Sequence, residues 1–379
     1  MLSQRCTLLA PTGKAAGRIR EAAGLLATTV HSWLYQPVET PEGVVVFHRR
    51  DLDKLQRADL IIVDEASMVG PDMMGDLVVA CTAIRAGLLL VGDDFQLPPV
   101  QKPGAPEYCA LLDMRVNRAV RLTEVMRQAL DSPVLRAATL IREGQVRAGL
   151  KVLPTLHRET LDVVREGGAV IAHTNATRHT INLRLRRALG IEGEVPQPSE
   201  PLLIMQNDAR TGYFNGEVVR FKRWLVQPSE YVWKSERVGA KWRTFNPPKV
   251  AHFGVAEVEG ASGIVHRTIL CAEELLGEQP ELTPRAYYGG AGGWLRDTVA
   301  KAAKAGVPLL NNLTLSGQRP PLLRANLGYC LTAHKAQGSE WKRVIVMVEK
   351  SVRPDKRDGQ RWLYTAITRA REQTFITYL

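Results

Sequence analysis

Four apolar residues, Leu60 to Val63, are followed directly by two acids, Asp64 and Glu65. A short uninterrupted apolar run rich in β-branched residues is typical of a strand buried on both faces of a parallel sheet. Ligands bind beyond the carboxyl ends of such strands, where these acids would lie. One carboxylate there can hold Mg²⁺ through its water shell, and the other can orient or deprotonate a water that attacks a nucleotide. Alternatively, the two acids simply end the strand as a solvated turn.

Composition indicates a soluble protein with a polyanionic partner. The 379 residues suffice for two or three domains, and 45% hydrophobic with 23% charged residues is ordinary for globular proteins. No apolar run approaches the roughly 20 residues of a membrane span, and the N-terminus has no signal-peptide pattern. We therefore expect a cytoplasmic protein with no membrane partner. The formal charge of +11 favours a polyanion, nucleic acid first, and five cysteines without paired spacing favour buried free thiols.

The segment before the acidic strand predicts another strand and a helix. Residues 7–11 have the character of a short strand, and a helix would begin near Thr12. Backbone N–H groups and Lys14 at that helix start would favour an anion. Gly13-Lys14 is nevertheless not a phosphate-binding loop. That pattern needs glycine at position 8 and Ser or Thr at position 15, where this chain has leucine and alanine.

The α/β pattern continues along the chain with one small insertion. We expect a helix start at 28–34, a β-hairpin at about 36–52, a helix over 73–87 and a buried strand over 88–91. Gln96 follows that strand, so it would lie near Asp64 if the two strands are neighbours. The alternative for Gln96 is an ordinary surface loop. A second α/β block is predicted from helices over 133–142, 175–189 and 361–372 and strands over 169–172, 344–348 and 374–378.

Residues 201–324 have a different, β-rich character. Val219 and Phe221 alternate with charged residues, as in a half-buried strand. Three tryptophans in this part, Trp224, Trp233 and Trp242, are expected to lie in a core rather than to stack on bases. The glycine-rich stretch 289–293 predicts a loop. A small barrel-like insertion would account for these features.

The order of several short motifs resembles that of superfamily 1 DNA helicases, specifically the RecD/Dda-like branch that moves 5′ to 3′. They are L-L-A-P-T-G-K-A-A (8–16), T-T-V-H-S-W-L (28–34), V-D-E-A-S-M (63–68), V-G-D-D-F-Q-L-P-P-V (91–100), V-M-R-Q (125–128), L-T-A-H-K-A-Q-G-S-E (331–340) and L-Y-T-A-I-T-R-A-R (363–371). One such motif is a weak signal, whereas the whole series in this order is specific. The resemblance covers nearly the whole chain apart from much of 201–324.

The resemblance implies an α/β fold with two RecA-like parallel-sheet domains of the P-loop NTPase type, the first truncated at its N-terminus. These domains would be residues 1–120, with the hairpin insertion at about 36–52, and residues 121–200 with 325–379. Residues 201–324 would form a β-rich SH3-like accessory insertion. The implied activity is that of an ATP-dependent DNA helicase or translocase. It would use ATP and Mg²⁺, move on single-stranded DNA, unwind duplex junctions and serve DNA repair or recombination.

The resemblance also assigns roles at the nucleotide to catalytic Asp64, Glu65, Gln96, Arg127 and Arg369 and to nucleotide-flanking Gly338 and Glu340. Asp64 would hold Mg²⁺, Glu65 would activate the attacking water, and Gln96 would sense the γ-phosphate. The two arginines would reach the γ-phosphate from the second block, because the planar guanidinium fork matches phosphate geometry. Glu340 would face the ribose.

Single-stranded DNA would cross both blocks and contact Thr12, Lys14, Thr29, His31, Thr174, Asn175, Thr332, His334 and Lys335. Contacts to phosphates fix register without reading sequence, so we expect sequence-tolerant and strongly salt-dependent binding. The implied mechanism is an inchworm, in which ATP draws the blocks together and hydrolysis lets them part. The hairpin would be the pin that splits the duplex.

The helicases that this chain resembles carry a glycine-rich phosphate loop before the first of these motifs, and this chain begins at that motif. Without the loop the β- and γ-phosphates lose most of their backbone N–H donors. We therefore expect this polypeptide alone to bind ATP poorly and hydrolyse it slowly. Three explanations are open: a fragment, a split enzyme completed by another chain, or a catalytically incompetent single-stranded-DNA-binding module. We favour the fragment, because the acids, Gln96 and the two arginines are intact.

Overall fold

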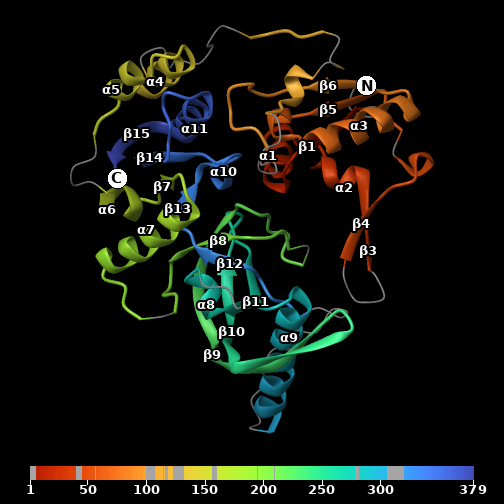
Figure 1. The fold of residues 1–379 in the computed structure, drawn as a ribbon, viewed down its shortest axis with the longest axis vertical. Helices are drawn as coiled ribbons and strands as arrows, with labels where there is room; N and C mark the ends of the chain where they lie inside the picture. Colours follow the sequence, from red (N-terminus) through yellow and green to blue (C-terminus); the bar gives the residue numbers. More distant parts are fainter. Residues whose placement is uncertain are drawn as a thin grey trace. The chain divides into compact units, whose positions relative to one another are not determined.

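The computed structural model describes residues 6–39, 45–55, 57–99, 107–113, 115, 118–122, 132–155, 160–193, 195–208, 210–277, 281–304 and 320–379. By the proximity of its Cα atoms the chain divides into two compact units (Figure 1). The first comprises Met1–Asn175 and Leu331–Leu379, and the second comprises Ala176–Cys330. Besides a two-stranded hairpin, the described part of the first unit contains two four-stranded sheets, one for each predicted α/β block. The domain boundaries expected at 120, 200 and 325 stay a prediction.

The first sheet of the first unit is parallel throughout, with the strand order β2-β1-β5-β6. Its strands are β1 (Cys6–Ala10), β2 (Ala27–Thr29), β5 (Leu60–Val63) and β6 (Gly87–Leu90), and its helices are α1 (Gly13–Ala23), α2 (Val30–Leu34) and α3 (Pro71–Ile84). The core beside this sheet includes Leu9, Ile61 and Val63, packed with Met74 and Leu77 of α3. Because β5 and β6 are neighbours, the segments that follow them start at the same edge of the sheet.

A two-stranded antiparallel hairpin, β3 (Tyr35–Glu39) and β4 (Val45–Arg49), is inserted after α2, as predicted. Figure 1 shows it extending away from the first sheet. Its base is fixed by Asp76 of α3, whose carboxylate accepts hydrogen bonds from Tyr35 Oη and from Arg49 Nε at 2.8 Å. The turn predicted at residues 41–43 lies outside the described residues.

The second sheet has the order β13-β7-β14-β15, and β14 runs parallel to both of its neighbours. Its strands are β7 (Ala169–Ala172), β13 (Cys330–Thr332), β14 (Trp341–Val348) and β15 (Ala370–Tyr378), and its helices are α4 (Pro133–Arg142), α5 (Val146–Val152), α6 (Thr160–Arg165), α10 (Ala333–Ala336) and α11 (Arg357–Ile367). The helix predicted over 361–372 ends earlier, because β15 begins at Ala370 and pairs there with Trp341. Arg369 therefore lies in the short connection between α11 and β15.

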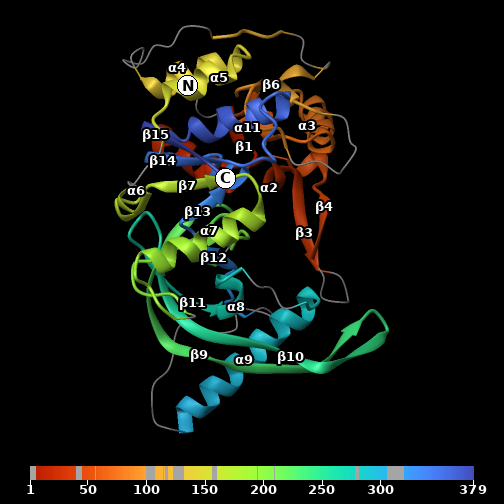
Figure 2. The same cartoon turned by 60° about the vertical axis from the view of Figure 1, so that its left-hand side comes forward.

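The second unit is built on a five-stranded sheet with the order β11-β10-β9-β8-β12, in which each pair of neighbouring strands is antiparallel. Its strands are β8 (Pro201–Ile204), β9 (Val218–Val238), β10 (Lys241–Glu259), β11 (Val265–Cys271) and β12 (Ala325–Leu327), with helices α7 (Asn175–Ala188), α8 (Ala272–Leu275) and α9 (Pro284–Lys304). Figure 2 shows α9 crossing the long β9–β10 ribbon. The β-rich character predicted from the sequence is confirmed, and the SH3-like assignment stays a prediction.

Two expectations for this unit are wrong. The glycine-rich stretch 289–293 is helical and lies inside α9. A Cβ on Gly290 would overlap the Trp233 ring, and one on Gly293 would lie 2.8 Å from Tyr231 Oη, so the glycines let the helix approach the aromatics of β9. Trp233 is in the core as expected, whereas Trp242 is 71% exposed.

The five cysteines, all of them described, form no disulfide, and Cys81, Cys271 and Cys330 are buried. Within the described ranges, no helix combines the length and the apolar character that crossing a bilayer would require.

Candidate nucleotide and DNA site

The acidic turn after β5 is fixed by backbone hydrogen bonds to both neighbouring strands. The Asp64 N–H donates to the Leu9 carbonyl at 3.0 Å, and the Ala66 N–H donates to the Val91 carbonyl at 2.8 Å. The Asp64 side chain accepts the Glu65 N–H at 2.8 Å. Glu65 has φ 51°, in the left-handed region that non-glycine residues rarely adopt outside turns and functional sites. The chain thus holds two adjacent carboxylates in a defined conformation at the edge of the sheet.

A close approach favours glycine at position 92, which directly precedes Asp93 and Asp94. A Cβ on Gly92 would lie 3.1 Å from the backbone nitrogen of Ala66 in the acidic turn. The absence of a side chain therefore lets the segment after β6 pass against the turn after β5. Gln96 follows in the same segment, and its position near Asp64 stays a prediction.

Glu65 and Arg369 are close enough to influence each other's ionisation. Burial raises the pKa of the Glu65 carboxyl, while the positive charge of Arg369 opposes that rise. Burial lowers the pKa of Arg369, and the negative charges of Glu65 and Glu340 oppose that fall. An acid from the first block and a guanidinium from the second therefore face the same region, as the two sheets of a nucleotide motor would require.

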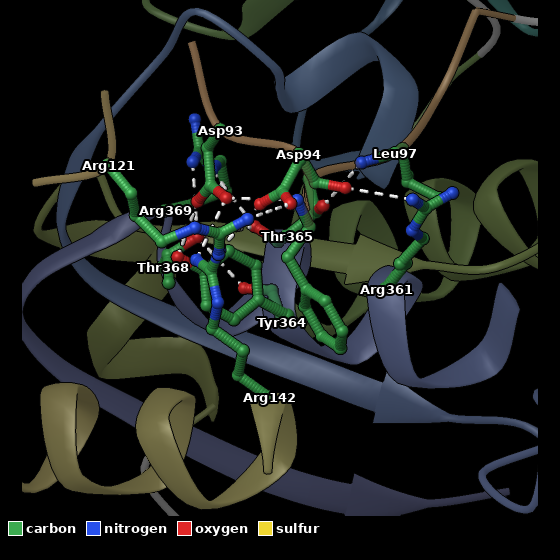
Figure 3. Close-up of polar contacts among 11 residues, drawn as sticks. Asp93, Asp94, Leu97, Arg121, Arg142, Arg361, Tyr364, Thr365, Thr368 and Arg369 are labelled. Carbon is green, nitrogen blue, oxygen red and sulfur yellow. Dashed lines mark hydrogen bonds and ion pairs between the residues drawn. The ribbon is translucent and has the colours of Figure 1, made fainter. Parts of the chain in front are cut away.

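The buried Arg369 guanidinium is held by neutral groups. It is 6% exposed, and it donates from Nε to the Thr365 carbonyl at 2.9 Å and from Nη2 to Thr368 Oγ1 at 3.1 Å (Figure 3). Across the described part of the chain, no carboxylate forms an ion pair with it. A buried cation without a paired anion is costly, so its remaining donors suit an anionic ligand.

Gln96 is the fourth of residues 93–97, which we name the glutamine segment. Its Oε1 atom is buried and has no hydrogen-bond partner among the described residues. The next residue, Leu97, is fixed through its backbone: its N–H donates to Thr365 Oγ1 at 3.0 Å and its carbonyl accepts Gln337 Nε2 at 3.1 Å. Figure 3 shows this end of the segment beside α11. The unpartnered amide oxygen is available to a ligand or a water.

Gly338 and Glu340 occupy the turn between α10 and β14. Gly338 has φ +68°, so the turn needs glycine there. Glu340 is paired with Arg18 of α1 at 3.3 Å and with Arg371 at 3.1 Å. Burial alone would raise the pKa of Glu340, but these two arginines lower it below the usual value, so the carboxylate is ionised at neutral pH. Its predicted position near the ribose stays a prediction.

Lys14 was predicted to contact DNA, and in this structure it reaches the turn before β14. Its Nζ lies against Ser339 Oγ and 5.9 Å from the centre of the Trp341 ring. The DNA contact of Lys14 stays a prediction.

Two threonines predicted to contact DNA from the first block are also N-caps of helices. Thr12 Oγ1 accepts the Ala15 N–H of α1 at 3.2 Å, and Thr29 Oγ1 accepts the Ser32 N–H of α2 at 3.0 Å. In each case the side chain satisfies a helix amide beside the surface assigned to DNA. His31 packs edge-on against Phe47 of the hairpin, with 4.6 Å between ring centroids, which gives it a structural role as well.

The second block presents its predicted DNA residues at two helix starts. Thr332 Oγ1 caps α10 by accepting the Lys335 N–H at 3.4 Å, and exposed His334 lies in that helix. Thr174 precedes exposed Asn175, and its N–H donates to Glu349 Oε1 at 3.2 Å. Glu349 is buried and also accepts the His173 N–H at 2.5 Å, so this carboxylate sets the backbone at the start of α7.

Arg127 lies outside the described residues. Several residues of the site were missed because their partners are remote in sequence: Arg18, Arg142, Glu349, Arg361, Tyr364 and Thr365. Of these six residues, only Tyr364 and Thr365 lie in a recognised motif, the one over 363–371.

The donor set fits Mg²⁺ and ATP in part. Within the part of the chain that the structure describes, no group of three or more His, Cys, Asp or Glu could hold a metal ion alone. Mg²⁺ is commonly bound by one or two carboxylates together with substrate phosphates and waters, which matches Asp64 at the sheet edge. The unpaired Arg369 and the free oxygen of Gln96 suit a phosphate and its attacking water. A glycine-rich cradle for the other phosphates does not occur in the sequence.

Comparisons with known proteins agree with this geometry. Residues 3–175 match the family described as an AAA domain, and residues 327–377 match the UvrD-like helicase C-terminal domain. The ATP-dependent RecD2 DNA helicase of Deinococcus radiodurans is 30% identical over 370 residues, covering 97% of this chain and 42% of that protein. A crystal structure of Pif1 helicase from Bacteroides, in complex with ADP-AlF3 and ssDNA, covers 98% of this chain and 82% of that chain. Its TM-score is 0.54 at 18% identity, which shows a shared fold.

The chain belongs to the RecD-like superfamily 1 helicases. The RecD subunit of the RecBCD enzyme of Mycolicibacterium smegmatis is also similar, with 28% identity over 97% of this chain and 61% of that protein. The chain thus spans about two-fifths to three-fifths of the length of these curated relatives. The family and the mixed α/β fold with parallel sheets, both predicted from the motifs, are confirmed.

Proposed function

We propose that this chain forms the motor of an ATP-dependent DNA helicase that moves 5′ to 3′ on single-stranded DNA and unwinds duplex junctions. The observation that carries the proposal is the proximity of Glu65, beyond β5, to the buried and unpaired Arg369, beyond α11. An acid and a guanidinium from two parallel sheets are what hydrolysis of a bound triphosphate needs. One relative named as an ATP-dependent DNA helicase is the dda protein of Enterobacteria phage T4, which is 29% identical over 36% of this chain.

In this proposal the chain's own residues divide the work of hydrolysis. Glu65 orients the attacking water and accepts its proton, and its raised pKa makes it a better base than an exposed glutamate. Gln96 hydrogen-bonds to the water or the γ-phosphate through its free oxygen. Arg369 stabilises the charge that develops on the phosphoryl oxygens, and Arg127 is assigned the same task. Asp64 would hold Mg²⁺, which would neutralise phosphate charge when bound.

Single-stranded DNA would lie along the capped helix starts of both blocks. Helix N-termini and threonine hydroxyls favour phosphate groups, and they contact the backbone without reading bases. Thr12 and Thr29 cap such starts on the first block, and Thr332 caps one on the second, where Thr174 directly precedes α7. Closing and opening of the blocks during each ATP cycle would shift the grip, and the β3–β4 hairpin would part the strands.

Turnover by the 379-residue polypeptide alone is expected to be slow, because its sequence holds no glycine-rich phosphate loop. The same observation favours a second candidate, a single-stranded-DNA-binding module that does not hydrolyse ATP, or one part of a split helicase. Both candidates predict DNA binding. They differ in ATP turnover by the full-length gene product.

The experiment measures ATP hydrolysis and strand separation by the protein purified at the length that its gene encodes. The motor predicts ATPase activity that single-stranded DNA stimulates, and unwinding of a duplex with a 5′ tail but not one with a 3′ tail. Glu65→Gln should keep DNA and nucleotide binding and lose turnover. The exposed ion pair of α6, Asp162 and Arg165, offers a matched control in Asp162→Asn.

The motor is excluded if the full-length product binds single-stranded DNA but shows no DNA-stimulated ATPase. That result would instead favour the binding module. Unwinding from a 3′ tail would contradict the polarity alone, and full turnover in Glu65→Gln would contradict the role of Glu65.

A further inference from the structure

One arginine from helix α4 joins the two acids that begin the glutamine segment. Arg142 donates from Nη1 to Asp93 Oδ1 at 3.0 Å and from Nη2 to Asp94 Oδ1 at 2.6 Å. Figure 3 shows Arg142 reaching both carboxylates. A planar guanidinium can satisfy two neighbouring carboxylates at once, whereas a lysine ammonium is a single point charge. The contact therefore depends on the shape of the side chain as well as on its charge.

Aromatic rings hold the same arginine in place. Its guanidinium carbon lies 5.6 Å from the centre of the Phe95 ring and 6.0 Å from that of Tyr364, and these rings meet edge-on. Tyr364 Oη donates to Asp93 Oδ2 at 2.5 Å. Burial alone would lower the pKa of Arg142, but Asp93, Tyr364 and Asp94 raise it, so the guanidinium is charged.

Asp94 receives further donors from the chain around it. Arg121 Nη2 donates to Asp94 Oδ2 at 2.6 Å, and Arg361 Nη2 donates to the Asp94 carbonyl at 2.8 Å. Burial alone would raise the pKa of Asp94, but Arg121 and Arg142 lower it below its usual value. The carboxylate is therefore ionised at neutral pH and remains available to both arginines.

The other end of the glutamine segment is buried in the second block. The Leu97 side chain packs in the core that contains Ala137 and Ile141 of α4, and its backbone is hydrogen-bonded to Thr365 and Gln337. Gln96 lies between these two fixed ends, and its buried amide oxygen has no partner among the described residues. Movement of α4 is thus tied to the position of the Gln96 side chain.

We propose that Arg142 is a positioning residue for Gln96. By joining Asp93 and Asp94 to α4, it sets where the glutamine meets the γ-phosphate and transmits that contact to the second block. This inference rests on the proposed function, because it needs ATP hydrolysis at the acidic turn. Arg142 acts through the acids and does not itself contact the nucleotide.

The test compares steady-state ATP hydrolysis, with saturating single-stranded DNA, by variants of the full-length gene product. Arg142→Ala should lower kcat by about 10- to 100-fold, since small misplacements far from the chemistry have effects of this size. The KM for ATP should change little, because the lost contact acts in the transition state. Arg142→Lys should remain impaired, because one ammonium cannot hold both carboxylates. Arg136→Ala, on the exposed face of the same helix, should match wild type.

A double-mutant cycle tests the partner. Asp94→Asn should also lower kcat, and the double variant with Arg142→Ala should lose little more than the stronger single variant. Arg142→Gln replaces the alanine variant if thermal melts show that the latter is unfolded.

An active wild type with unchanged kcat in the Arg142 variants would overturn this inference and leave the proposed function standing. Full rescue by lysine, or additive losses in the double variant, would also overturn it. A wild type without DNA-stimulated ATPase would overturn the proposed function and this inference together.

Discussion

Replacing Thr365 by valine should destabilise the contact between the glutamine segment and α11. Thr365 is fully buried, and its Oγ1 accepts the Leu97 N–H at 3.0 Å. Valine has nearly the same shape but no acceptor, so the buried N–H of Leu97 loses its partner. An unsatisfied buried donor costs about 1–3 kcal/mol. For a folding unit as large as the first compact unit, each kcal/mol of stability corresponds to roughly 2–4 °C in Tm. We therefore expect the Tm of Thr365→Val to fall by about 2–12 °C.

The assay is thermal unfolding followed by circular dichroism, with Thr139→Val as the control. Thr139 is exposed on α4, so its replacement should change stability by no more than about 0.5 kcal/mol. The carbonyl of residue 365, which accepts the Arg369 Nε hydrogen bond, is unchanged by the substitution. Equal melting of Thr365→Val and wild type would refute the reasoning, because it would mean that Leu97 does not depend on this acceptor.

Three further predictions follow from single contacts. Glu349→Ala removes the acceptor of the His173 and Thr174 amides, so the free energy of unfolding measured in urea should fall by about 1.5–3 kcal/mol. Fluorescence anisotropy should show weaker binding of single-stranded DNA. Gly338→Ala forces a side chain into φ +68°, so it should lower stability by about 1–2 kcal/mol in the same unfolding assay, and a wild-type midpoint would contradict this. Burial raises the pKa of Glu65, so the acid limb of kcat/KM, which reports the free enzyme, should have its midpoint above the usual 4.5 in a pH–rate profile.

The raised pKa of Glu65 also makes the stability of the folded protein depend on pH. A folded-state pKa above the unfolded value means that the protonated form is favoured by folding, and this contribution is lost as pH rises through the folded pKa. Glu65→Gln should therefore melt above wild type at neutral pH, and the difference should shrink toward pH 4.5. A constant difference across this range would contradict the burial of the charge.

The strands and the acidic turn could be predicted because their signals are local. Leu60–Val63 is a short apolar run that two acids end, and the structure makes it β5. The glycine-rich stretch 289–293 misled the prediction because glycine more often marks a loop than a close helix contact. The glycines are needed because α9 packs against the rings of Trp233 and Tyr231, which lie some 60 residues earlier in the sequence. The end of α11 was likewise decided by the pairing of β15 with β14.

The candidate site divides in the same way. Asp64, Glu65, Gln96 and Arg369 were named from motifs. The motif over 363–371 also contains Thr365 and Thr368, which hold Arg369, but no motif contains Arg142. Arg142 contacts acids 48 and 49 positions away, so only the folded chain brings them together. An arginine on an amphipathic helix is common, so Arg142 gives no signal in the sequence by itself.

The most direct measurement of the central claim is the single-turnover rate of ATP hydrolysis by the full-length product carrying Arg369→Ala, at saturating single-stranded DNA. If acids from the first block and Arg369 from the second act on one triphosphate, the rate should fall by about 10³-fold or more. The affinity for single-stranded DNA should stay near that of wild type. A rate within twofold of wild type would contradict the account.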